Sequence, residues 1–65
     1  MTTLIGPKIA ALRKQRGMRQ KDLAKYVGVC EDYISMIERG KRTPARKTLI
    51  RIALILEVSL EELMK

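Results

Sequence analysis

The stretch Gln20–Gly40, QKDLAKYVGVCEDYISMIERG, contains the pattern that decides the fold. Apolar residues recur in it at the spacing of one helix face, first before Gly28 and again between Gly28 and Gly40. Glycine commonly ends a helix because it adopts the left-handed conformation without strain. The stretch therefore predicts two short helices, over residues 20–27 and about 31–39. The residues expected to face the core are Leu23, Ala24, Val27, Ile34 and Ile37.

Three positions in this stretch have the residue types that two closely crossing helices require. Counted from Gln20, they are the fifth residue, Ala24, the ninth, Gly28, and the fifteenth, Ile34. A small side chain at Ala24 lets the helices approach, Gly28 allows a sharp turn, and Ile34 packs back on the first helix. This spacing favours a helix-turn-helix, although a helix pair in another kind of bundle would share part of it.

Three further helices are predicted around this pair, so the expected fold class is all-α with five helices. The first helix ends before Gly17 and has Ile5, Ile9 and Leu12 on one face. After the pair comes the basic loop KRTPAR, in which Pro44 restricts the preceding residue to extended geometry. The next helix therefore begins only after this loop.

The C-terminal part of the chain reads as one longer and one short helix. The longer helix runs from about residue 46 to residue 57 and carries a single apolar stripe. The short one, residues 60–64, begins at a Ser59 cap, with Glu62 three residues on to complete a capping box. The residues expected to face the core are Leu49, Ile52, Ala53, Leu56, Leu60 and Leu63.

Length and composition limit the class of protein. A chain of 65 residues is expected to form one domain, residues 1–65, with no room for a separate effector domain. The hydrophobic fraction of 46% is typical of globular proteins, and no apolar run reaches the about 18 residues of a membrane span. With Cys30 as the single cysteine and no histidine, we expect no disulfide, no metal site and no cofactor. A reduced intracellular setting fits this cysteine content.

Positive charge is concentrated in the larger, N-terminal part of the chain. Residues 1–47 contain 12 Lys/Arg and 4 Asp/Glu, a charge of +8, whereas residues 48–65 contain 2 and 3, a charge of −1, which together give +7. This division indicates a surface for a polyanion and a separate packing surface. The alternative is a solvated basic face that only aids solubility.

The segments LRKQRGMRQKDLAKYVGVCEDYISMIERGKRTP and TLIRIALILEVSLEELM resemble the phage-repressor and Cro-type helix-turn-helix family, also called the xenobiotic-response-element family. The resemblance covers about residues 5–64 and implies a lambda-repressor-like domain of five helices. It also implies a cytoplasmic, nucleoid-associated transcription regulator from a bacterium, archaeon or phage. Such a repressor binds double-stranded DNA at a palindromic operator as a homodimer, and no small-molecule effector is evident here.

Several residues match positions that have roles in that family. Gln20 would bond a phosphate and brace the start of the recognition helix, the second of the two short helices. Arg13 and Glu38 would form a structural ion pair between the first and third helices. The remaining expected phosphate contacts are Arg19, Lys41, Arg42 and Thr43. A solvated charge is the alternative for Lys41 and Arg42.

The exposed face of the recognition helix would choose the DNA sequence, because its N-terminal residues touch base edges. Many family members carry Ser, Thr or Gln at positions 30–32, where this chain has Cys, Glu and Asp. Either one acid accepts a hydrogen bond from a cytosine amine, or both only stabilise the helix start and repel wrong sequences. The expected base-contacting residues are Glu31, Asp32, Tyr33, Ser35 and Met36.

Cys30 occupies the position of the cap residue before the recognition helix. A thiol is a weak acceptor, so we expect a poor cap there. A cysteine at a helix start can also become reactive, but a packed thiol without a redox role is the favoured interpretation.

A surface for dimerisation is predicted on the longer C-terminal helix. Ile50 and Leu54 lie four residues apart on a face separate from the core stripe, and Leu60 or Met64 would extend this ridge. The alternative is that Ile50 packs against the short helix or against an N-terminal arm that contains Leu4.

Other functional classes fit the sequence less well. An enzyme is not expected, because the chain has no histidine, no Ser/His/Asp set and no glycine-rich phosphate loop. RNA binding is disfavoured because two tyrosines are the only aromatic residues available for stacking. The main alternative is a protein-interaction module, such as an antitoxin or anti-repressor, whose acids at positions 31 and 32 would meet a basic partner.

Overall fold

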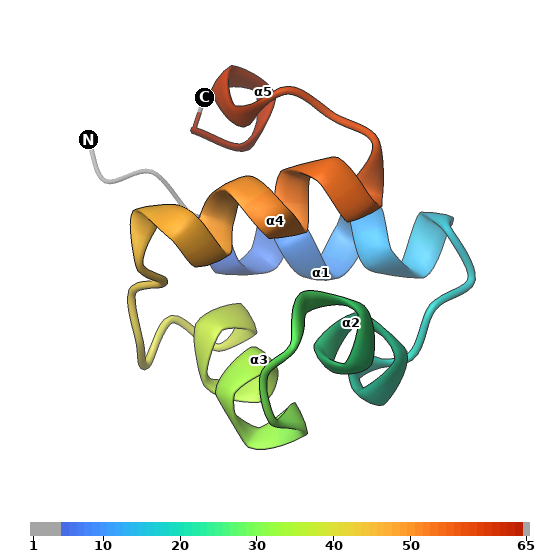
Figure 1. The fold of residues 1–65 in the computed structure, drawn as a ribbon, viewed down its shortest axis with the longest axis vertical. Coiled ribbons are helices and arrows are strands. Elements are labelled where there is room, and N and C mark those ends of the chain that lie inside the picture. Colours follow the sequence, from blue (N-terminus) through green and yellow to red (C-terminus); the bar gives the residue numbers. More distant parts are fainter. Residues whose placement is uncertain (1–4, 65) are drawn as a thin grey trace.

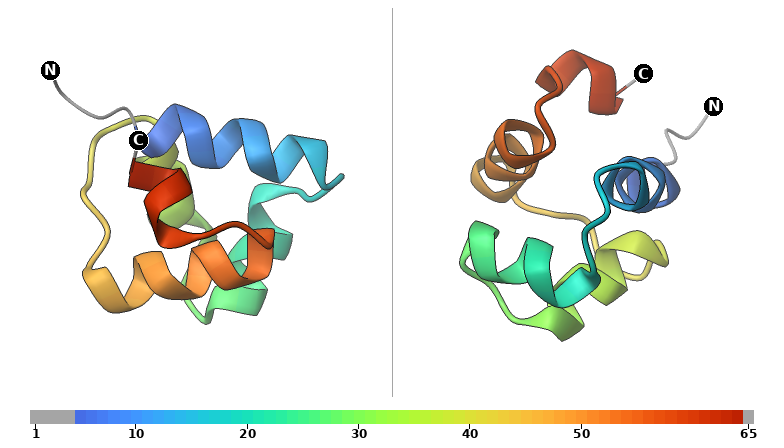
Figure 2. Two further views of the ribbon diagram at one scale, coloured as in Figure 1. Left: turned by 90° about the horizontal axis from the view of Figure 1, so that it is seen from above. Right: turned by 90° about the vertical axis from the view of Figure 1, so that its right-hand side faces the viewer.

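Residues 5–64 are described by a computed structural model, and they form five helices and no strand (Figure 1). α1 packs against α3 and α4 packs against α2, and α5 contacts both α1 and α4 on the side away from α2 and α3 (Figure 2). Within this range, no helix is long and apolar enough to cross a membrane. The predicted all-α class is confirmed, with α1 (Ile5–Gln15), α2 (Gln20–Val27), α3 (Glu31–Glu38), α4 (Arg46–Leu56) and α5 (Leu60–Met64).

All five helices contribute to one hydrophobic core. Ile9 of α1 and Leu63 of α5 are fully buried, and Leu12 and Leu60 are half-buried against them. Burying a side chain of this size stabilises the fold by about 1.5–3 kcal/mol. The predicted apolar stripes are confirmed, because the other buried core residues are Leu23, Ala24, Val27, Ile34, Ile37, Leu49, Ile52, Ala53 and Leu56.

The turn between α2 and α3 depends on the backbone conformation of Gly28. Its φ is 89°, in the left-handed region, and its N–H donates to the Ala24 carbonyl oxygen at 2.8 Å. The next N–H, of Val29, donates to the same oxygen at 3.0 Å. A Cβ at Gly28 would meet only the Arg51 guanidinium, at 3.8 Å, so conformation rather than lack of space selects glycine here.

The chain turns back on itself directly after α3. α3 ends at Glu38, one residue earlier than predicted. Gly40 has a φ of 76°, which lets its N–H donate to the Ile37 oxygen at 3.1 Å and lets the Lys41 N–H donate to the Met36 oxygen at 2.8 Å. These bonds satisfy carbonyl groups of the last helical turn and hold the start of the basic loop beside α3.

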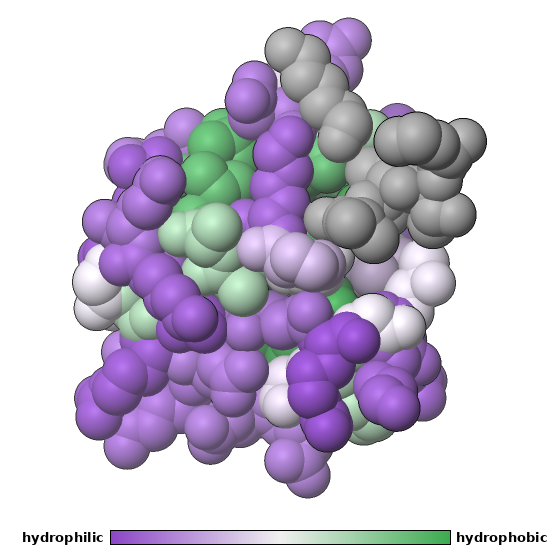
Figure 3. All heavy atoms as spheres, turned by 180° about the vertical axis from the view of Figure 1, so that it is seen from behind, coloured by the Kyte–Doolittle hydropathy of each residue, from purple (hydrophilic) through white to green (hydrophobic). Residues whose placement is uncertain are grey.

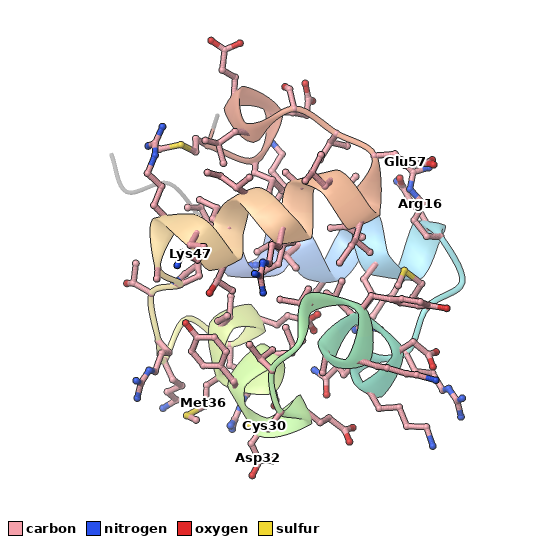
Figure 4. All side chains as sticks on the ribbon, viewed as in Figure 1. Arg16, Cys30, Asp32, Met36, Lys47 and Glu57 are labelled. Atoms are coloured by element: carbon pink, nitrogen blue, oxygen red, sulfur yellow. The ribbon has the colours of Figure 1, made fainter. Side chains whose placement is uncertain are left out.

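The end of α4 has a feature that the sequence does not reveal. α4 ends at Leu56, and Glu57 is the one non-glycine residue within 5–64 that has a positive φ, 60°. The Val58 N–H bonds to the Ala53 oxygen at 3.0 Å. The Arg16 side chain donates from Nε and Nη2 to the Leu56 oxygen, at 2.8 and 2.6 Å, and lies beside Glu57 in Figure 4. This contact ties the end of α1 to the end of α4.

Replacing Glu57 by glycine is expected to raise the free energy of unfolding by about 0.5–1 kcal/mol, because a side chain in the left-handed region is strained. The acceptor of the Arg16 hydrogen bonds is the main-chain oxygen of Leu56, so these bonds can still form in the variant. Urea unfolding followed by circular dichroism measures the change. Glu57→Gln is the control, since it removes the charge but keeps Cβ. Equal stability of the two variants would show that the left-handed conformation carries no penalty here.

Candidate nucleic-acid interface

α3 presents its first turn outward, at the edge of the molecule farthest from α5. Glu31 and Asp32 are exposed, and Asp32 points away from the other helices in Figure 4. Tyr33, Ser35 and Met36 were expected on the same exposed face but are half-buried. They border the buried stripe of Ile34 and Ile37; Tyr33, for example, lies four residues before Ile37 and shares its side of the helix.

The start of α3 has exposed acids and no side-chain cap. Cys30 is the cap residue and makes no side-chain hydrogen bond to the helix, which agrees with the poor cap predicted for a thiol. It is exposed rather than packed as expected, because it precedes the outward first turn of α3. Glu31 and Asp32 lie in the first turn, where the helix dipole favours negative charge. The acids therefore stabilise the helix start whether or not they also contact a ligand.

A buried polar network holds α3 in place. The predicted ion pair forms: Arg13 Nε donates to Glu38 Oε2 at 2.7 Å, and Arg13 Nη2 donates to Oε1 at 3.1 Å. Gln20 Nε2 donates to the same Oε1 at 3.0 Å, and Arg13 Nη1 donates to the Met18 oxygen at 2.7 Å. The network therefore connects α1, the start of α2 and the end of α3. Gln20 Nε2 carries a second hydrogen that this network does not use.

Arg19, a predicted phosphate contact, has a nearby acid. Its backbone N–H donates to Asp22 Oδ2 at 2.9 Å, and its guanidinium Nε donates to the same atom at 3.2 Å. First the backbone N–H and then the guanidinium hold the pKa of Asp22 below its ordinary value. The carboxylate is therefore charged at neutral pH and offsets part of the attraction that Arg19 would exert on a phosphate.

The loop after α3 carries exposed cations close to the recognition helix. Lys41, Arg42 and Thr43 are all exposed. The Arg42 guanidinium lies 5.7 Å from the centre of the Tyr33 ring, within the range of a cation–π interaction. On the face opposite to that of Figure 1, hydrophilic side chains cover the part at the level of α2 and α3, while hydrophobic ones gather higher up (Figure 3).

Residues 9–63 match the family model described as "Helix-turn-helix". The chain belongs to the phage-repressor type of this helix-turn-helix family. It is 39% identical over 64 residues to the ImmF control region 10 kDa protein of Bacillus phage phi105, with 92% of this chain and 71% of that protein covered. The family match and the observed fold therefore agree.

Solved structures of helix-turn-helix regulators have the same fold. The P22 c2 repressor in complex with a synthetic operator superposes with a TM-score of 0.89 at 36% identity, covering 94% of this chain and 92% of the repressor chain. SinR, a regulator of biofilm formation known from Bacillus subtilis, was solved in complex with DNA. It superposes with a TM-score of 0.88 at 34% identity, covering 94% of this chain and 98% of the SinR chain.

The ridge predicted on this helix-turn-helix domain is exposed in part. Ile50, Leu54 and Met64 are 41%, 72% and 49% exposed. Leu60 is half-buried and packs against the core, because it lies on the inner side of α5, so it does not extend the ridge as predicted. The alternative contact of Ile50 with Leu4 lies outside the described residues.

Two contacts of the helix-turn-helix are not predicted by the sequence. Arg51 Nη1 donates to the Val27 oxygen at 3.3 Å and so connects α4 with the end of α2. Arg42 stacks over Tyr33, nine residues earlier in the chain. Neither pair has a periodic signal in the sequence, since both depend on how loops and helices meet. Within residues 5–64, no group of His, Cys, Asp and Glu has an arrangement that suits a metal ion.

Proposed function

We propose that this protein is a transcription regulator, a repressor, that binds a palindromic DNA operator as a homodimer with α3 in the major groove. The single observation that carries the proposal is the outward first turn of α3, braced by the Arg13–Glu38–Gln20 network and flanked by an exposed basic loop. The similar chains of the P22 c2 repressor and SinR were solved with DNA, which supports the same role here.

Attraction to the phosphate backbone would come from the exposed loop and the start of α2. Lys41, Arg42 and Thr43 would lie along the backbone, with the free amide hydrogen of Gln20 and, more weakly, Arg19 as further donors. Such contacts give affinity and register without sequence choice. Binding is therefore expected to weaken steeply as salt rises, because each neutralised phosphate releases counterions.

Sequence choice would come from the first turn of α3. Glu31 and Asp32 are the exposed groups there, and a carboxylate in the major groove accepts a hydrogen bond from the cytosine N4 amine. Ser35 and Met36 lie further along the helix and would touch neighbouring base edges. The acids would also repel the phosphates of a misaligned duplex, which disfavours wrong sequences.

The proposal is tested by selecting bound duplexes from a random pool with the purified protein. We expect a palindromic consensus with half-sites about one DNA turn, ~34 Å, apart, since a symmetric dimer places two recognition helices at that spacing. Recovery of no consensus, together with the absence of salt-dependent retention on DNA, would favour the protein-interaction module. In that case the exposed acids at the start of α3 would face a basic protein partner.

Replacing Glu31 by glutamine is expected to weaken binding to the selected operator by roughly 1–3 kcal/mol if the carboxylate accepts from a cytosine. Substituting that base pair should then reduce the affinity of the Glu31→Gln variant only slightly. Asp32→Asn is the parallel substitution on the same helical turn, and it tests whether Asp32 reads the base instead. Equal effects of Glu31→Gln on every operator variant, measured by fluorescence anisotropy, would exclude direct reading by Glu31.

Replacing Leu54 by glutamate is expected to abolish dimerisation at micromolar concentration, because the acid would be buried unpaired in an apolar interface. Sedimentation equilibrium measures the mass of the variant against that of the wild type. Ala11→Glu places the same acid on the exposed side of α1 and should leave the mass unchanged. If the Leu54→Glu protein keeps the wild-type mass, the ridge is not the interface.

A further inference from the structure

We propose that Tyr33 acts on DNA binding through Arg42 rather than by reading a base edge. The ring would be a positioning residue that holds the Arg42 guanidinium beside α3, where the charge meets a phosphate. This inference rests on the proposed function, because it assigns a role within the same interface. From its position on the recognition helix alone, Tyr33 is expected to contact a base, and the positioning role replaces that expectation.

The first argument is the placement of the ring. Tyr33 is half-buried and packs against the hydrophobic core, so its orientation is fixed from within the domain. The Arg42 guanidinium carbon lies 5.7 Å from the ring centre. A ring that packs on the core and lies under a guanidinium offers less surface to a base than the exposed side chains of Glu31 and Asp32 do.

The second argument is the backbone that carries Arg42. The left-handed Gly40 and the bond from the Lys41 N–H to the Met36 oxygen, 2.8 Å, fold the loop back along α3. Arg42 follows directly, so its main chain is placed by this turn and its side chain by Tyr33. Both ends of an otherwise flexible side chain are therefore restrained in the free protein.

The third argument is energetic. An exposed arginine loses rotamer freedom when it contacts a phosphate, and this loss opposes binding. A guanidinium that already stacks on a ring loses less of that freedom on binding. Because phosphate contacts carry no sequence information, the benefit should be the same on every duplex. This equality distinguishes a positioning role of Tyr33 from direct reading of a base.

The test compares Tyr33→Leu, which removes the ring, with Tyr33→Phe, which keeps the ring and removes the hydroxyl. Affinities are measured for the duplex recovered by selection and for an unrelated duplex of equal length. Tyr33→Leu is expected to weaken both by the same factor, roughly two- to fivefold as for an exposed cation–π contact, and Tyr33→Phe to change neither. Thermal unfolding confirms that both variants are folded.

Two further backgrounds show whether the effect passes through Arg42. In Arg42→Ala protein, Tyr33→Leu should have no additional effect on either duplex. In Lys41→Ala protein, which lacks the neighbouring exposed cation instead, the full effect of Tyr33→Leu should persist. In the free protein, NMR should show ring-current shifts of the Arg42 side-chain protons that disappear in Tyr33→Leu and remain in Tyr33→Phe.

The outcomes separate this inference from the proposed function. A loss confined to the selected duplex, a loss that persists in Arg42→Ala, or an equal loss in Tyr33→Phe would overturn the positioning role alone. Absence of the ring-current shifts from the wild-type protein would do the same. A wild-type protein that binds neither duplex would overturn the proposed function and this inference with it.

Discussion

Replacing Glu38 by alanine is expected to lower the free energy of unfolding by about 3–5 kcal/mol, because it leaves a buried guanidinium without its counter-charge. Arg13 is only 7% exposed, and Glu38 accepts two of its hydrogen bonds, at 2.7 and 3.1 Å. Gln20 loses its acceptor in the same substitution. A domain of this size has roughly 0.05–0.15 kcal/mol of stability per residue, so the loss is a large share of the total.

Urea unfolding of a short variant series measures this effect. Glu38→Gln keeps an oxygen acceptor and should lose less than Glu38→Ala, which provides a folded comparison if the alanine variant unfolds. Asp22→Asn, at the exposed Arg19 pair, is the matched control and should change stability by under about 1 kcal/mol. If Glu38→Ala loses no more than Asp22→Asn, the buried pair does not hold α3 to α1.

Replacing both members of the Arg13–Glu38 pair gives a second prediction. Replacing Arg13 by methionine and Glu38 by leucine together should recover most of the stability lost in Glu38→Ala, because no unpaired charge is then buried. The double variant should still bind DNA more weakly than the wild type, since Gln20 has no partner to orient its amide. Stability and DNA binding are thus expected to separate in this variant.

Replacing Gly6 by alanine is expected to lower the free energy of unfolding by about 1–3 kcal/mol or more, although alanine is the better helix former. Gly6 is buried where α1 crosses the end of α3. A Cβ there would collide with the Ile37 carbonyl oxygen and lie 2.7 Å from that of Glu38. Both atoms belong to the backbone of α3, so relief requires the two helices to move apart.

Ala11→Gly is the matched control for this substitution. Ala11 is exposed on the same helix, so the change measures the intrinsic difference between glycine and alanine, about 0.5–1 kcal/mol in favour of alanine. Gly6→Ala should have the opposite sign to that expected from propensity alone. If Gly6→Ala instead raises the urea midpoint, α1 and α3 do not approach as closely as their backbones indicate.

The helices and the core could be predicted because their signals are local. Apolar residues at helical spacing, such as Leu23 and Val27, mark the buried face of each helix, and the left-handed Gly28 marks the turn between α2 and α3. The predicted ends of α3 and α4 each differ by one residue from those observed. Helix ends are less certain because the last turn depends on capping bonds as well as on periodicity.

The candidate site could be predicted only in part. Exposure of Glu31 and Asp32 follows from their place in the first turn of α3, ahead of its apolar positions Ile34 and Ile37. The Arg13–Glu38 pair was expected through the family resemblance, because residues 25 apart give no local signal of contact. Tyr33 was assigned to the bases from its position on α3, whereas the structure shows its ring under Arg42.

The sequence by itself determined where the helices lie, which side of each is buried and where positive charge is concentrated, since periodicity, turn residues and composition are properties of short segments. Only the tertiary structure decided which polar groups meet. Gln20 bonds to Glu38, Arg16 to the end of α4, and Arg42 stacks on Tyr33. Each contact depends on the angles at which helices cross and loops return, and these angles result from packing of the whole core.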